Sequence, residues 1–105
     1  MKIYTVQRMD KFDYDFSVEL KNLGCYTDKT KAIARSRAEY MQMNGEYEDE
    51  MIKYSDADIY DPEELDSGAL YMEVDPEDGY YIISFGAEEN YESHAVWVDE
   101  WELQE

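Results

Sequence analysis

Apolar and polar residues alternate along two stretches near the start of the chain. KIYTVQ (residues 2–7) is rich in β-branched and aromatic residues, which predicts a first strand. FSVELKNLGCY (residues 16–26) places Phe16, Val18 and Leu20 at every second position, which predicts a second strand with one buried face. Gly24 indicates a bulge or bend in it. The polar DKFDYD between them makes the pair a hairpin with a long connection.

The pattern then changes to a helical period. TDKTKAIARSRAEYMQMNG predicts a helix over residues 28–43, which Thr27 or Asp28 caps and which Asn44-Gly45 ends. Its predicted buried stripe is formed by Ile33, Tyr40 and Met41 with the aliphatic stem of Arg37. Its exposed side carries the only basic surface that the sequence indicates, which consists of Lys29, Lys31, Arg35 and Arg37.

The second half of the chain is acidic and ends in three predicted strands. A short second helix is predicted near residues 46–54, and one helical turn is predicted to start at Asp61-Pro62 and to end at Ser67-Gly68. The strands are predicted over residues 69–74, 80–85 and 95–103, with a DPEDG turn between the first two and a loop from Gly86 to His94. The order predicts one α+β domain, residues 1–105: an antiparallel sheet of about five strands in ββα–βββ order, with one main helix packed on one face.

Charge divides the chain into two unequal halves. The net charge is −18, and all nine Lys and Arg residues lie at or before Lys53. Residues 1–53 hold ten acids against nine bases, whereas residues 54–105 hold seventeen acids and no base. Such a half repels nucleic acid and anionic membranes and attracts basic proteins or cations.

The lack of an apolar targeting segment and the single cysteine favour a cytoplasmic location. No stretch reaches the eighteen or so apolar residues of a membrane span, and the first residues lack the apolar run of a signal peptide. Cys25 is the only cysteine, so no internal disulfide is expected. We therefore expect a cytoplasmic protein without membrane association.

Catalytic and metal-binding patterns are weak. His94 is the only histidine and is predicted to be a solvated loop residue, and Cys25 is predicted to be a small core residue. Neither belongs to a nucleophile motif, and no phosphate-binding loop is present, so we expect no enzyme, no catalytic residues and no cofactor. DADIYDPEELDS (residues 56–67) has Asp where a calcium loop needs Gly and Ser where it needs the bidentate Glu, so no metal site is predicted.

The remaining hypothesis concerns the acidic surface itself. Duplex DNA presents one charge per roughly 1.7 Å of axis. Side chains on one face of a strand recur every 6.6 to 6.8 Å or so. Carboxylates on adjacent strands and loops therefore reach a comparable density, and interleaved tyrosines would occupy the place of bases. The predicted partner-binding residues are Asp56, Asp58, Asp61, Glu63, Glu64, Asp66, Glu73, Asp75, Glu77, Asp78, Glu88, Glu89 and Glu92.

Two resemblances extend this hypothesis. The opening MKIYTV…LGCYTDKTKAIA and the closing WVDEWEL resemble small uncharacterised proteins of bacterial and phage genomes, in which a hairpin ends in G-x-[FY]-[ST] before a K-x-K-A helix. Small size, acidity and aromatic richness resemble anti-CRISPR proteins of mobile elements. That resemblance implies a non-enzymatic inhibitor that imitates DNA in the basic groove of a nucleic-acid-binding protein, most of all a type II CRISPR RNA-guided nuclease. It implies no particular fold.

Two further interpretations stay open at this level. An acidic accessory or adaptor protein, with weak cation binding, would have the same composition. Exposed tyrosines would equally suit a homodimer.

Overall fold

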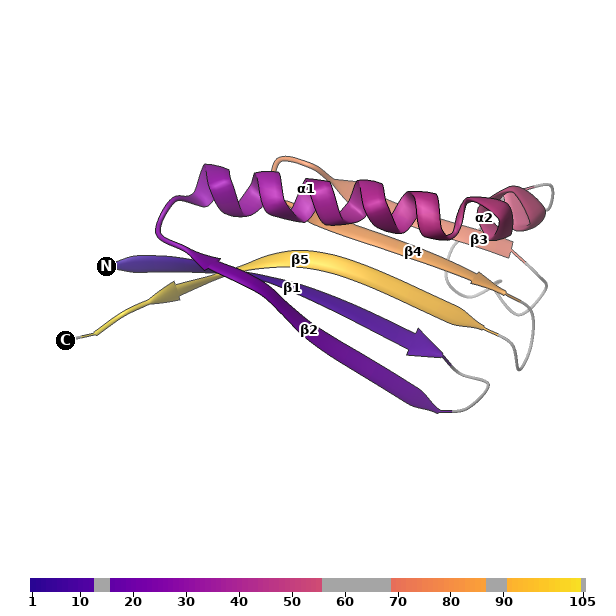
Figure 1. Ribbon diagram of the computed structural model, residues 1–105, viewed down its shortest axis with the longest axis horizontal. Helices are drawn as coiled ribbons and strands as arrows, with labels where there is room; N and C mark the ends of the chain where they lie inside the picture. Colours follow the sequence, from indigo (N-terminus) through magenta and orange to yellow (C-terminus); the bar gives the residue numbers. More distant parts are fainter. Residues whose placement is uncertain (13–15, 56–68, 87–90, 105) are drawn as a thin grey trace.

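Five strands and two helices form a single α+β arrangement in the computed structural model, which describes residues 1–12, 16–55, 69–86 and 91–104 (Figure 1). The strands make one antiparallel sheet in the spatial order β2-β1-β5-β4-β3. The elements are β1 (Lys2–Phe12), β2 (Ser17–Tyr26), α1 (Lys29–Glu46), α2 (Glu48–Ser55), β3 (Ala69–Asp75), β4 (Tyr80–Gly86) and β5 (Glu92–Glu102). The predicted fold class and the ββα–βββ order are confirmed.

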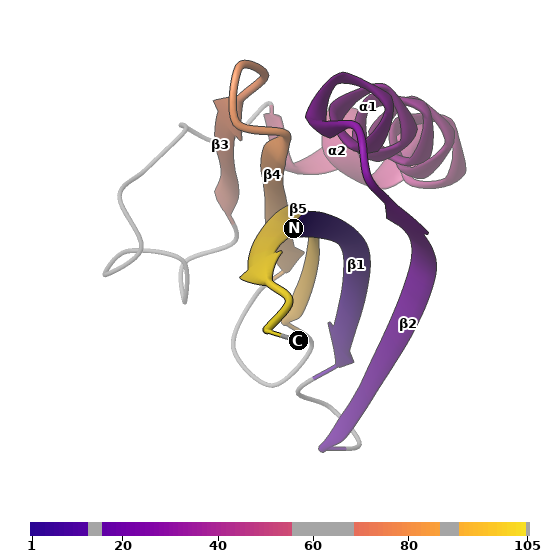
Figure 2. The same cartoon turned by 90° about the vertical axis from the view of Figure 1, so that its left-hand side faces the viewer.

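Both helices lie on the same side of the sheet, which curves around α1 (Figure 2). We call this side the helix face and the other side the open face. The two faces of β1 alternate, because Tyr4, Val6, Arg8 and Asp10 are buried while the residues between them are partly exposed. Within the described residues, no helix has the length and apolar character needed to cross a membrane.

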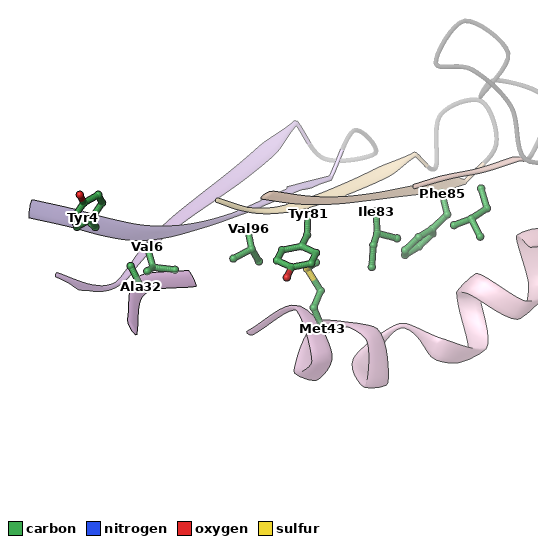
Figure 3. Packing of buried hydrophobic residues seen from close by; sticks show 9 residues of the cluster. Tyr4, Val6, Ala32, Met43, Tyr81, Ile83, Phe85 and Val96 are labelled. Atoms are coloured by element: carbon green, nitrogen blue, oxygen red, sulfur yellow. The ribbon is translucent and has the colours of Figure 1, made fainter. Parts of the chain in front are cut away.

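The hydrophobic core lies between the helix face and the helices. Val6, Val96, Tyr81 and Ile83 come from β1, β5 and β4, and their side chains point toward Met43 and Ala32 of α1 (Figure 3). Ile83 is fully buried, and burial of such a side chain contributes about 1.5–3 kcal/mol. Tyr40 of α1 stacks on Tyr81 with ring centroids 4.3 Å apart, which fixes the helix against β4.

The buried stripe of α1 differs from the predicted one. Its buried residues are Ala32, Ser36, Glu39 and Met43, which fall at i, i+4, i+7 and i+11. Arg37 and Met41 are exposed, and Ile33 and Tyr40 are only partly buried. A small residue and two polar residues occupy the stripe because α1 lies close to the sheet at Ser36 and pairs a carboxylate with Arg8 at Glu39. A search for apolar positions alone could not find this face.

The apolar residues predicted to form the buried face of the second strand are exposed. Phe16, Val18 and Leu20 are 94%, 54% and 68% exposed. Val18 and Leu20 pair with Lys11 and Met9, so they share the open face, which no described helix covers. The period of two was right and the burial was wrong, because periodicity does not say which side of a sheet another layer will cover.

Other sequence expectations differ in position. Cys25 is exposed on β2 rather than packed in the core. β5 begins at Glu92, so the predicted loop ends earlier and His94 belongs to a strand. The second helix predicted near residues 46–54 is confirmed as α2, whereas the helical turn predicted from Asp61-Pro62 lies outside the described residues.

Candidate functional site

The predicted partner-binding acids divide into two sets. Glu73, Asp75, Glu77, Asp78 and Glu92 lie in the described part of the chain. The others lie outside the described residues, namely Asp56, Asp58, Asp61, Glu63, Glu64, Asp66, Glu88 and Glu89. The described part of the predicted surface therefore consists of the β3–β4 hairpin and its surroundings.

The β3–β4 hairpin brings four of these acids together. Glu73 and Asp75 pair with Ile82 and Tyr80, which places both carboxylates on the open face. Glu77 and Asp78 occupy the turn that follows, and all four residues are exposed. We call Glu73, Asp75, Glu77 and Asp78 the acidic hairpin. It forms a compact negative protrusion at one end of β3 and β4.

Gly79 fixes the acidic hairpin to the rest of the molecule. Its backbone N–H donates to the Pro76 carbonyl over 3.3 Å and its φ is +70°, a value that favours glycine. A Cβ atom at this position would lie 2.7 Å from Ser36 Oγ and 2.8 Å from Val98 Cγ2. The turn thus rests directly on α1 and β5, so its carboxylates have a defined position relative to both.

No cation neutralises the acidic hairpin within the described residues. None of its four carboxylates forms a salt bridge with a described lysine or arginine. Glu73 instead accepts a hydrogen bond of 2.8 Å from the Tyr71 hydroxyl, and this bond, with some burial, raises the pKa of Tyr71. The negative charge of the acidic hairpin is consequently available to a partner.

A second, buried group of ionic residues lies between α1 and the sheet. The Arg8 guanidinium donates to Asp10 through Nε and Nη2 at 3.1 Å and to Glu46 through Nη2 at 3.1 Å. Its Nη1 lies 3.5 Å from Glu39 Oε2, an ion-pair distance without a hydrogen bond. Arg8, Asp10 and Glu39 are each at least 94% buried. We call Arg8, Asp10, Glu39, Glu46, Glu92 and His94 the buried ionic network.

His94 is fully buried in this network, so its prediction as a solvated loop residue was wrong. Its Nδ1 lies 2.6 Å from Asp10 Oδ1 and its Nε2 lies 3.1 Å from Glu92 Oε2. Tyr47 stacks on the ring at 4.1 Å and Phe12 meets it edge-on at 5.5 Å. Glu92, a predicted partner-binding residue, is therefore engaged with His94 and lies apart from the acidic hairpin.

Charge pairing controls the ionisation of the network. Burial by itself would raise the pKa of Asp10, but hydrogen bonds with His94 and Arg8 outweigh it and hold that pKa below the usual 3.8. Burial also opposes the charge on Arg8, yet its hydrogen bonds with Asp10 and Glu46 raise its pKa. Removal of one partner would leave an uncompensated buried charge.

The buried ionic network was not predicted from the sequence, although the sequence contains two signals for it. Arg8 and Asp10 continue the alternation of Tyr4 and Val6 on β1, so they follow the buried face of that strand. Glu39 falls at helical spacing from Ala32 and Met43. Because charged residues are rarely buried unless paired, neither signal alone predicts that these residues are buried.

The open face near the end of β5 carries ordered aromatic side chains. Trp97 donates from Nε1 to Asp99 Oδ2 at 2.9 Å, and Trp101 donates from Nε1 to Thr5 Oγ1 at 2.9 Å. Trp97, Asp99 and Trp101 alternate on one side of the strand, and Trp101 is 53% exposed. The indole planes are thus held by their edges while part of their surface remains in solvent.

One further feature, a pocket, has a less specific chemistry. An open pocket of about 470 Å³ lies between the ends of the helices and β3, and it is lined by Met41, Asn44, Gly45, Glu48, Met51, Ile52 and Leu70. Its lining is mainly apolar and includes one carboxylate. In the part of the chain that the structure describes, no group of three or more His, Cys, Asp or Glu side chains is arranged to hold a metal ion.

Known proteins provide no further assignment. We compared the chain with protein-family models, with curated protein sequences and with solved structures, and none of them matches it.

Proposed function

We propose that this protein is a non-enzymatic inhibitor that places its acidic surface in the basic nucleic-acid-binding groove of a cytoplasmic partner protein. A type II CRISPR RNA-guided nuclease is the favoured partner, because its groove is built to hold nucleic-acid backbones through positive charge. The acidic hairpin forms the described part of the binding surface, and the acidic residues outside the described ranges would extend it.

One observation carries this proposal: the acidic hairpin is exposed, fixed in position and unpaired with any described cation. Arg8 is engaged in the buried ionic network, and Lys2 forms an ion pair with Glu100 at 3.6 Å. Lys29, Lys31 and Arg37 are exposed on α1 and form no described salt bridge with the hairpin. Unpaired carboxylates repel one another, and a cationic groove would relieve that repulsion.

The electrostatic mechanism predicts two properties of the binding. Association should be fast at low salt, because opposite fields steer the two proteins together, and it should weaken as salt screens exposed charges beyond a Debye length of about 10 Å at 0.1 M. The bound protein should also compete with target DNA, because both ligands occupy the same cations.

The test measures competition by the purified protein for a type II effector loaded with its guide RNA. We expect the wild-type protein to reduce binding and cleavage of target DNA at low salt. A variant that neutralises the acidic hairpin combines Glu73→Gln, Asp75→Asn, Glu77→Gln and Asp78→Asn. From four rim charges we expect about tenfold or greater loss of affinity, mainly through slower association.

A matched variant separates position from total charge. It combines Glu19→Gln, Glu48→Gln, Asp49→Asn and Glu50→Gln, which removes the same charge from exposed residues of β2 and α2. We expect this control to keep most of the inhibition. Equal loss in both variants would show a nonspecific charge effect, and unchanged DNA binding by the effector with the wild-type protein would exclude this class of partner.

A further inference from the structure

The end of β5 extends beyond the neighbouring strand β4. β1 pairs with β5 along its whole length, from Glu92 to Glu102, whereas pairing with β4 ends at Tyr81 and Val96. Residues 97–102 therefore have a strand on only one side among the described residues, and Figure 1 shows this segment continuing past the β3–β4 turn. We call residues 97–102 the protruding end of β5.

The backbone of the protruding end presents hydrogen-bonding groups at its free edge. Leu103 N–H donates to the Met1 carbonyl at 2.7 Å, which makes residues 1 and 103 a hydrogen-bonded pair in the β1–β5 register. Because such pairs alternate in antiparallel sheets, the odd-numbered residues of β5 bond to β1. The N–H and C=O groups of Val98, Glu100 and Glu102 therefore point away from β1. Gly79 of the β3–β4 turn lies against Val98, so the edge is free at Glu100 and Glu102, where another strand could pair with their backbone groups.

Side chains on both faces of this edge favour the same kind of strand. On the open face, Asp99 lies between Trp97 and Trp101, and cationic groups bind both carboxylates and indole rings. On the helix face, the side chains of Glu100 and Glu102 are 50% and 58% exposed, and they form ion pairs with Lys2 Nζ at 3.6 Å and with the N-terminal ammonium group at 3.1 Å. Exposed pairs of this kind contribute about 0–1 kcal/mol, so an incoming cation can compete for both carboxylates. An added strand would meet carboxylates on each of its faces, so an alternating pattern of basic residues would suit it in either register.

We propose, building on the proposed function, that the protruding end of β5 binds an extended, arginine-rich segment of the partner protein by strand addition. The outward backbone groups of Glu100 and Glu102 would form the ladder. Guanidinium groups of the segment would stack on Trp97 or Trp101 and pair with Asp99, because arginine combines a flat stacking surface with charge. Backbone pairing supplies affinity in this mode, and the alternate side chains supply specificity.

A second copy of this chain is a poorer occupant of the same edge. Antiparallel pairing of two protruding ends would bring Glu100 of one copy opposite Glu100 or Glu102 of the other. Like charges directly opposite each other destabilise strand pairs. The charge of the edge thus selects against self-association and for a basic strand.

The test uses the full protein and a short synthetic peptide that alternates arginine and threonine. Binding is followed by tryptophan fluorescence and by amide chemical shifts and amide hydrogen exchange. We expect saturable binding, with slowed exchange at Glu100 and Glu102. A peptide of the same sequence with every backbone nitrogen methylated keeps its charge but cannot donate to a ladder, so we expect its binding to be lost.

Two variants at one position separate backbone pairing from charge. Glu100→Gln removes the carboxylate and keeps the outward N–H, whereas Glu100→Pro removes both; neither removes a ladder bond to β1. We expect Glu100→Pro to weaken binding of the peptide at least about threefold more than Glu100→Gln does. This is the loss of affinity expected from one backbone hydrogen bond. Circular dichroism and melting curves establish that each variant is folded, and the methylated peptide gives the same comparison without any change to the protein.

The outcomes are distinct from those of the proposed function. Equal binding of the methylated and unmethylated peptides, or shifts confined to the acidic hairpin, would overturn strand addition even if the protein inhibits the effector. Peptide binding through β5 by a protein that leaves the effector unaffected would support strand addition and overturn the favoured partner. A dimer that Glu100→Pro dissolves would show that a second copy occupies the edge, which would also overturn the proposal.

Discussion

The buried ionic network and the acidic hairpin use carboxylates in opposite ways. In the network, Asp10 and Glu46 lie 3.1 Å from the Arg8 guanidinium, and Asp10 also contacts His94. In the acidic hairpin, four exposed carboxylates have no described cation within salt-bridge distance. The first arrangement links α1 to the sheet, because loss of one partner would leave an uncompensated buried charge. The second leaves its charge unpaired among the described residues.

The difference teaches that net charge alone does not locate a binding surface. Asp10, Glu39 and Glu46 contribute to the net charge of −18, yet all three form ion pairs with Arg8. The first half of the chain, which is nearly neutral, uses its cations partly to hold its own fold. The acidic hairpin, by contrast, has four exposed carboxylates that pair with no lysine or arginine among the described residues.

The largest expected effect comes from disruption of the buried ionic network. Asp10→Ala should lower the free energy of unfolding by about 3–5 kcal/mol, because Arg8 and His94 would remain buried without their common acceptor. Urea denaturation measures the change. Lys2→Ala is the control, because it removes an ion pair that is more than half exposed and should cost about 1 kcal/mol or less. Equal effects of the two substitutions would contradict the comparison.

A smaller effect should appear as a pH dependence. The pKa of Asp10 is held below 3.8 in the folded protein, so the unfolded chain takes up this proton first as the pH falls. The stabilisation by Asp10 is present above pH 3.8 and is lost as the pH falls through the lower, folded pKa. We expect the stability difference between the wild type and Asp10→Asn to shrink below about pH 4. Measuring this difference cancels the effect of the other titrating acids, and a constant difference down to pH 2 or so would be inconsistent with the pairing.

The smallest effect concerns the acidic hairpin. The variant with Glu73→Gln, Asp75→Asn, Glu77→Gln and Asp78→Asn should be more stable than the wild type at low salt by about 1 kcal/mol, which raises Tm by about 4 °C or more. Moderate salt should raise the Tm of the wild type and should affect the variant less, because screening relieves the same repulsion. A flat or falling salt response of the wild type would indicate that its acids are already paired. Differential scanning calorimetry at several salt concentrations makes the measurement.

Local pattern predicted the elements well and their environments poorly. The strands at β3 and β4, the start of α1 at its Asp28 cap and the turn at Gly79 follow from alternation, capping and turn residues, which act over a few neighbouring positions. The predicted end of α1 at Asn44-Gly45 is wrong, because the helix continues to Glu46 and is capped by Tyr47. The exposure of Val18 and Leu20 could not be predicted, because it depends on which face of the sheet the helices cover. The burial of His94 could not be predicted either, because its partner Asp10 is 84 positions away along the chain.

The sequence by itself determined the order of strands and helices, the segregation of charge and the acidic turn between β3 and β4. These properties depend on neighbouring residues and on composition, so no packing information is needed to find them. Tertiary structure alone decided that Arg8, Asp10, Glu39 and His94 meet inside the protein and that β5 extends past β4 with a free edge. Both results depend on how distant segments align across the sheet, and that register is set by the packing of the helix face against α1.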